Sequence, residues 1–146
     1  MIRLLIVDDH EMLRETLHSV LGREFDIEIV AEAGNGEQAL ALTRTLRPDV
    51  VLMDLMMPVL NGIEATRRIV AHNPAMRVLA HSSHLERRLV RTMLDYGALG
   101  YISKSAGRTE LLQAVRSVAA GTQFLCQETA ALMAKAVPVR SFRSLA

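Results

Sequence analysis

Short apolar runs alternate along this chain with longer segments of helical periodicity, and this alternation is the feature that most restricts the fold. The apolar runs are rich in Val, Ile and Leu, and they span residues 2–7, 26–32, 49–54, 77–81 and 99–103. Helical spacing of apolar residues fills the segments between them, at residues 11–22, 36–46, 62–72, 85–95 and 109–120. Strands that alternate with helices form parallel sheets covered on both faces. The sequence therefore predicts a doubly wound α/β fold with a five-stranded parallel sheet and helices on both faces.

The ends of the elements carry recognisable stop and start signals. Thr109 is a suitable N-cap for the helix expected over residues 109–120. A further helical pattern covers residues 127–137, Pro138 ends it, and the remaining residues show no clear periodicity. We therefore expect one domain over residues 1–121, followed by a short helix and linker over residues 122–146.

The composition of the chain excludes several classes of protein. The 146 residues are 50% hydrophobic, and 17 basic against 16 acidic residues leave a net charge of +1, which gives no general attraction to nucleic acid or membranes. The single cysteine, Cys126, excludes an internal disulfide. The N-terminal apolar run is too short for a signal peptide, and no stretch approaches the length of a membrane span. These features predict a soluble cytoplasmic domain.

Polar side chains stand where the expected strands end. Asp8 and Asp9 follow the first strand, Asp54 ends the third, Ser82 follows the fourth and Lys104 follows the fifth. In doubly wound sheets the carboxyl ends of the strands form the ligand-binding edge, so we expect these residues to converge. Three neighbouring carboxylates repel one another and favour a bound cation, and an all-oxygen ligand set favours Mg²⁺. Asp54 is then a candidate nucleophile toward a phosphoryl donor, with Lys104 and Ser82 stabilising the transferred group.

Each of these residues also has a structural interpretation. Asp8 and Asp9 could be a solvated loop pair, and Asp54 could cap the turn that follows it. Ser83 is a rival to Ser82 as the hydroxyl of the site. The occurrence of all the strand-end residues together favours the functional interpretation.

Four sequence segments, which contain these strand-end residues, together resemble a known protein family. The segments "LLIVDDHE", "PDVVLMDLMMPVLNGIEATRRI", "VLAHSS" and "GALGYISKS" resemble the receiver domain of two-component response regulators, over residues 1 to about 121. The resemblance implies a flavodoxin-like sheet with strand order 2-1-3-4-5. It also implies Mg²⁺ as cofactor and a sensor histidine kinase as partner.

The resemblance assigns roles to individual residues. It implies that Asp54 is the phosphoacceptor and also a metal ligand. Asp9 corresponds to the acidic residue that contacts Mg²⁺ directly, Asp8 to the one that acts through water, and Met56 would supply a backbone carbonyl to the metal. Lys104 corresponds to the lysine that pairs with the phosphoryl group.

Two further residues match the family's switch positions. Ser82 corresponds to the serine or threonine whose hydroxyl moves to the phosphoryl group, with Ser83 as the small residue beside it. Tyr101 corresponds to the aromatic residue that turns inward when Ser82 moves.

The finer pattern resembles the NarL/LuxR-type subfamily, in which a receiver precedes a helix-turn-helix domain. No recognition helix follows residue 121 in this sequence. We therefore expect either a truncated protein or a stand-alone receiver. The implied output is transcription through a DNA-binding domain absent from this chain, with a homodimer formed on phosphorylation, no membrane contact and no direct DNA contact. The alternative is a receiver that acts by protein–protein interaction or phosphorelay.

Two other function classes remain as rivals. A phosphatase with an Asp nucleophile would carry a second Asp two residues later, where this chain has Met56. An interaction module with an inactive site would often lack Asp54 or Lys104, and both are present. We therefore do not expect an enzyme with a free substrate.

Overall fold

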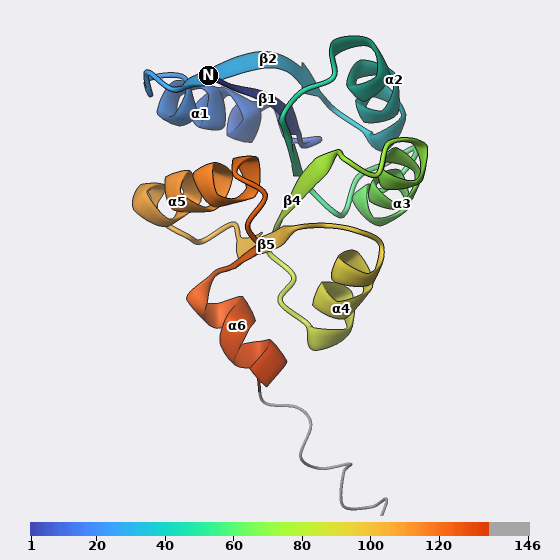
Figure 1. Cartoon of the computed structure of the whole chain (residues 1–146), viewed down its shortest axis with the longest axis vertical. Coiled ribbons are helices and arrows are strands. Elements are labelled where there is room, and N and C mark those ends of the chain that lie inside the picture. Colours follow the sequence, from blue (N-terminus) through green and yellow to red (C-terminus); the bar gives the residue numbers. More distant parts are fainter. Residues whose placement is uncertain (135–146) are drawn as a thin grey trace, which may run out of the picture.

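The computed structural model describes residues 1–134 and shows a single parallel sheet in the order β2-β1-β3-β4-β5-β6 (Figure 1). The strands are β1 (Ile2–Val7), β2 (Ile27–Ala33), β3 (Val50–Met53), β4 (Arg77–Ser82), β5 (Gly100–Ser103) and β6 (Phe124–Leu125). The predicted fold class and the order of the first five strands are confirmed.

The sheet has one strand more than the five that the sequence pattern predicts. β6 pairs Phe124 with Gly100 and Leu125 with Tyr101, and the Phe124 N–H donates to the Leu99 carbonyl. Two residues are too few to show the alternation by which a strand is recognised in a sequence. The strand exists because the chain leaving the preceding helix passes the free edge of β5 and satisfies that edge's backbone groups.

Helices cover both faces of the sheet. They are α1 (Glu11–Leu21), α2 (Gly36–Leu46), α3 (Gly62–His72), α4 (Arg87–Asp95), α5 (Arg108–Ala119) and α6 (Gln127–Ala134). Side chains of α1 and α5 bury one face with Leu4, Ile6 and Leu52, whereas α2, α3 and α4 bury the other with Leu5 and Val7. Successive strand residues point to opposite faces, so uninterrupted apolar runs supply both cores.

Side-chain caps explain where α2 and α3 begin. Asn35 and Asn61 cap α2 and α3, since their side chains accept hydrogen bonds from the backbone N–H groups of Gln38 and Glu64. The expected N-cap at Thr109 was wrong. The cap of α5 is Gly107, because the Leu111 N–H already donates to the Gly107 carbonyl and closes the first turn earlier.

The described part of α6 packs onto the domain. Leu132 and Met133 join the core on the α4 side, and Thr129 is fully buried, with its hydroxyl 2.9 Å from Cys126 Sγ. The expected helix over 127–137 is present as far as Ala134, and its last residues, like Pro138, lie outside the described residues. No helix within residues 1–134 has the length and apolar character needed to cross a bilayer.

Candidate functional site

The strand-end residues converge because backbone hydrogen bonds extend the sheet beyond its last paired residues. The Asp8 N–H donates to the Ala33 carbonyl (3.0 Å) and the Asp54 N–H donates to the Val7 carbonyl (2.9 Å). On the neighbouring pair of strands, the Lys104 N–H donates to the Ser82 carbonyl (3.0 Å). Each side chain therefore leaves the same edge of the sheet, as the sequence predicted from strand ends alone.

Lys104 links two buried carboxylates. Its Nζ lies 2.9 Å from Asp8 Oδ2 and 3.0 Å from Asp54 Oδ1. The side chains of Asp8 and Asp54 are 1% and 5% exposed, so one ammonium serves two desolvated negative charges. The second oxygen of Asp54, Oδ2, is buried and accepts no hydrogen bond from the described residues. A buried carboxylate oxygen without a donor calls for a cation or a hydrogen-bond partner.

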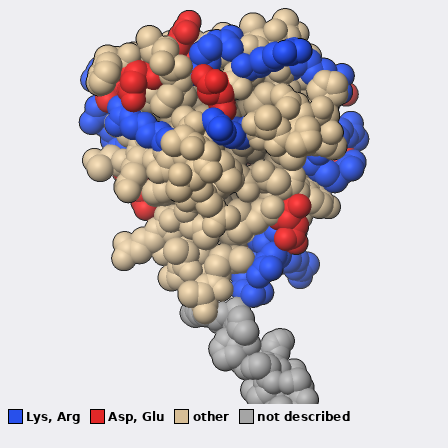
Figure 2. Space-filling model, viewed as in Figure 1, with Lys and Arg blue, Asp and Glu red and all other residues tan. Residues whose placement is uncertain are grey.

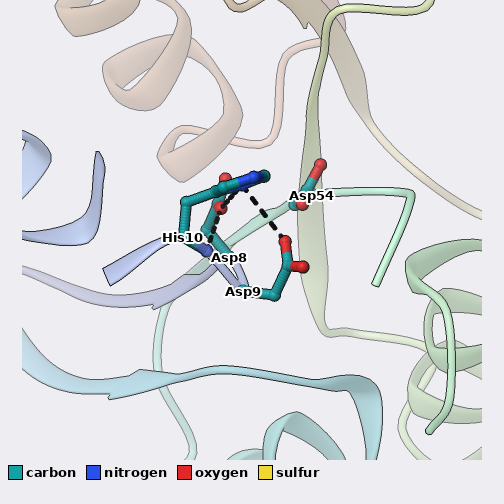
Figure 3. A group of neighbouring side chains, drawn as sticks. All are labelled: Asp8, Asp9, His10 and Asp54. Atoms are coloured by element: carbon teal, nitrogen blue, oxygen red, sulfur yellow. Dashed lines mark hydrogen bonds and ion pairs between the residues drawn. The ribbon is translucent and has the colours of Figure 1, made fainter. Parts of the chain in front are cut away.

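His10 also belongs to this cluster, although no sequence motif above assigns it a role. Its backbone N–H donates to Asp8 Oδ1 (2.8 Å), and its Nδ1 lies 3.2 Å from both Asp8 Oδ1 and Asp9 Oδ1 (Figure 3). One ligand atom from each of Asp8, Asp9, His10 and Asp54 fits within 4.8 Å of the others. One feature of the sequence could have predicted this contact, because His10 directly follows Asp8 and Asp9 where the chain enters α1.

Burial and neighbouring charges separate the pKa values of the two buried carboxyls. Burial raises the pKa of Asp54, Lys104 opposes this effect, and the charges of Asp8 and Asp9 reinforce it. Burial alone would also raise the pKa of Asp8, but hydrogen bonds from Lys104 and from the His10 backbone outweigh burial and lower this pKa. The pKa of Lys104 is raised because its two carboxylate partners outweigh the effect of burial. The ammonium is therefore held in its charged form beside Asp54.

Ser82 and Tyr101 meet through the backbone of His84. Ser82 Oγ accepts a hydrogen bond from the His84 N–H (2.9 Å), and the Tyr101 hydroxyl donates to the His84 carbonyl. Ser82 is 1% exposed and Ser83 is exposed, which favours Ser82 as the hydroxyl of the site. Tyr101 is fully buried in the core, so the ring already points inward.

The loop after Asp54 is packed tightly against the site. A Cβ at Gly62 would lie 1.8 Å from the Asp54 carbonyl oxygen, so only glycine fits there. Val59 has a φ of +70°, and the Leu60 N–H donates across it to the Pro58 carbonyl (2.8 Å), which forms a tight γ-turn. Met56 in the same loop is 44% exposed, and its carbonyl remains a predicted metal ligand.

The decisive comparison is with a protein-family model. The response regulator receiver domain matches residues 4–116, which include every strand-end residue described above. This chain belongs to the response regulator receiver family. The resemblance expected from the sequence motifs is therefore confirmed.

Individual relatives support the same family. Response regulator GacA of Pseudomonas viridiflava is 39% identical over 134 residues, which are 92% of this chain and 63% of GacA. Transcriptional activator protein ExaE of Pseudomonas putida is 43% identical over 131 residues, which are 90% of this chain and 61% of ExaE. The chain thus spans less than two thirds of the length of these curated relatives.

A solved structure agrees with the receiver fold. The LuxR-family two-component response regulator from Aurantimonas sp. SI85-9A1 is 35% identical, with a TM-score of 0.89, and the match covers 92% of this chain and 96% of that one. Receivers of this kind are parts of signalling proteins. The roles of individual site residues in this receiver remain predictions, although the structure brings most of them together.

Proposed function

We propose that this receiver accepts a phosphoryl group on Asp54 from a sensor histidine kinase, with Mg²⁺ bound beside it. The observation that carries the proposal is the buried, unpartnered Oδ2 of Asp54, held next to Lys104 and two further carboxylates. Most buried polar atoms in folded proteins have a partner, so this oxygen favours a bound cation beside Asp54.

The residues present fit a magnesium ion. Asp8, Asp9 and Asp54 supply carboxylate oxygens, which are the ligands that hard cations prefer, and the Met56 carbonyl would add a neutral oxygen. A bound Mg²⁺ would neutralise charge on the carboxylates and on the phosphoryl oxygens. Because Lys104 pairs with both Asp8 and Asp54, the chain itself keeps these two carboxylates together before any cation binds.

The chain's own groups account for the transfer. A carboxylate oxygen of Asp54 attacks the phosphorus of the kinase's phosphohistidine. The new P–O bond forms as the P–N bond breaks, and the electron pair of the P–N bond remains on the kinase imidazole. Lys104, 3.0 Å from Asp54 Oδ1, supplies a fixed positive charge to the phosphoryl oxygens. Ser82 would add a hydroxyl donor after giving up its bond with the His84 N–H.

This exchange at Ser82 supplies a switch. Ser82 and Tyr101 both bind His84, so withdrawal of Ser82 toward Asp54 loosens the β4–α4 loop that also holds the Tyr101 hydroxyl. Tyr101 lies on β5 against β6, and the Cys126 N–H that opens α6 donates to the Tyr101 carbonyl (3.4 Å). A charge at Asp54 would therefore bias a two-state element that reaches α6.

The output we propose is control of transcription, through a DNA-binding domain outside this chain. ExaE, which is named a transcriptional activator, is longer than the region it shares with this chain. On the face in Figure 2, basic and acidic side chains are interspersed, which gives no basic stripe for DNA there. A homodimer formed on phosphorylation and a cytoplasmic location stay predictions. Action as a stand-alone receiver by protein interaction or phosphorelay is the alternative.

Intact mass tests the proposal directly. The protein is incubated with Mg²⁺ and a small phosphodonor, beside Asp54→Asn and a sample without Mg²⁺. We expect one added phosphoryl group in the wild type and none in either control. An equal addition in Asp54→Asn would place the acceptor elsewhere. A wild type that is unmodified by both the donor and a phosphorylated histidine kinase would favour an interaction module with an inactive site.

A further inference from the structure

We propose that His10 is a fourth ligand of the carboxylate cluster and that it lets the site bind a borderline divalent cation such as Zn²⁺ through an imidazole nitrogen. The inference rests on the proposed metal site but adds a residue and a class of metal to it. His10 stands at the N-cap of α1, directly after Asp8 and Asp9, and its ring lies beside their carboxylates in Figure 3.

The spacing of the atoms suits coordination. His10 Nδ1 lies 3.2 Å from Asp8 Oδ1 and 3.2 Å from Asp9 Oδ1. Ligand atoms at adjacent corners of an octahedron with bonds of about 2.1 Å are about 3 Å apart. With one ligand atom from each side chain, Asp54 included, all four atoms lie within 4.8 Å of one another. Small rotations of the side chains would let all four ligand atoms reach one cation.

Asp54 adds a second observation that points to a ligand at the cluster. The Asp54 residue is 4% exposed, and its Oδ2 is buried without a hydrogen-bond partner among the described residues. The contact between Lys104 and Asp54 is to the other oxygen, Oδ1, at 3.0 Å. Among the residues that the structure describes, Asp54 Oδ2 therefore lacks a partner of the kind that a bound cation would supply.

The donor chemistry decides which cation gains from His10. Mg²⁺ prefers oxygen ligands, whereas Zn²⁺ binds imidazole nitrogen as readily as carboxylate oxygen. The side chain of His10 is 69% exposed, so its ring can turn toward a cation or leave the oxygens of Asp8 and Asp9 to Mg²⁺. We infer that removal of His10 weakens Zn²⁺ binding and leaves Mg²⁺ binding almost unchanged.

Calorimetric titration of the full chain with Zn²⁺ and, separately, with Mg²⁺ tests this. The variants are His10→Ala, Asp9→Ala and His18→Ala, where His18 is a matched control on α1 that pairs with Glu32 away from the cluster. In His10→Ala the Kd for Zn²⁺ should rise at least about 10-fold, the scale at which metal sites respond to lost support, while the Kd for Mg²⁺ changes less than about twofold. His18→Ala should leave both Kd values unchanged, and Asp9→Ala should weaken both metals.

Nitrogen-15 NMR of the imidazole rings gives a readout that does not depend on affinity. Zn²⁺ should move the Nδ1 resonance of His10, and Mg²⁺ should not. An equal Kd for Zn²⁺ in wild type and His10→Ala, or an unmoved His10 resonance at saturating Zn²⁺, would overturn the inference. Such a result with normal Mg²⁺ binding would leave the proposed function intact. A wild type that binds no Mg²⁺ would instead contradict the metal part of the proposed function.

Discussion

Lys104 Nζ lies 3.0 Å from Asp54 Oδ1, which places an ammonium against the predicted phosphoacceptor. The same ammonium lies 2.9 Å from Asp8 Oδ2, so it holds two buried carboxylates from different strands at one edge of the sheet. Substitutions of Lys104 and of Asp54 measure how this pair contributes to stability, separately from its predicted role in phosphoryl transfer.

Replacement of Lys104 by Met should destabilise the metal-free domain. The change leaves two buried carboxylates without their cation, and charge-assisted contacts of this kind contribute about 1–3 kcal/mol. Urea unfolding at pH 7 with a chelator measures the loss. The loss should shrink in acid, because the raised pKa of Asp54 lets that carboxyl protonate early as the pH falls. A loss that is the same at pH 7 and in acid would show that the pairing of the ammonium with the two carboxylates is not responsible.

Replacement of Asp54 by Asn should have the opposite effect on the metal-free domain. A folded-state pKa above the usual value means that the ionised form is disfavoured by folding, so this carboxylate costs stability at neutral pH. We expect a gain of about 0.5–2 kcal/mol at pH 7, the usual range for relief of a strained functional site. The gain should fade below the unfolded pKa of 3.8, where the carboxyl is protonated in both states. A less stable Asp54→Asn at pH 7 would contradict the assigned direction.

Replacement of Gly62 by Ala should destabilise the fold and displace Asp54. The added Cβ would lie 1.8 Å from the Asp54 carbonyl oxygen, and backbone must move to admit it. Overpacking of this kind costs about 2–3 kcal/mol. Gly107→Ala is the matched control, because a Cβ there meets no atom within 4 Å. Thermal unfolding of the two variants measures the decrease in Tm that each substitution causes. Equal decreases would contradict the packing argument.

Replacement of His81 by Leu should flatten the acid dependence of stability. Burial lowers the pKa of His81 from 6.5 to about 4, so protons bind the unfolded chain first and stability falls as the pH drops from about 6.5 toward 4. Between pH 8 and pH 5 this difference in proton binding lowers the free energy of unfolding of the wild type by about 2 kcal/mol. His81→Leu should show no such decrease. Unfolding free energies at the two pH values give the difference. His72→Leu, at an exposed helical position, should keep the wild-type slope.

Replacement of Tyr101 by Phe tests the link between β5 and the β4–α4 loop. The ring stays buried, but the hydrogen bond to the His84 carbonyl is lost, at about 0.5–1.5 kcal/mol. Tyr96→Phe, the other tyrosine in the chain and 37% exposed, is the control. Hydrogen exchange of amides in residues 83–86 should quicken only in Tyr101→Phe. Unchanged hydrogen exchange in both variants would show that the Tyr101 hydroxyl does not stabilise the β4–α4 loop.

Much of the fold could be predicted because its signals are local. The run 2–7 matches β1, and the helices over 36–46 and 62–72 match α2 and α3. Prediction failed where neighbours in space decided the outcome. Phe124 and Leu125 form a strand only because β5 offers a free edge, and α5 begins after Gly107 although Thr109 carries the better capping side chain.

The sequence by itself determined which chemistry is present at the site. Asp8, Asp54 and Lys104 each follow an apolar run, and the geometry of a parallel sheet sends all three to one edge. Only the tertiary structure decided how these groups interact, because distances and burial depend on residues remote in sequence. The Lys104 contacts, the raised pKa of Asp54 and the approach of His10 to two carboxylates arise from packing, which no pattern along the chain encodes.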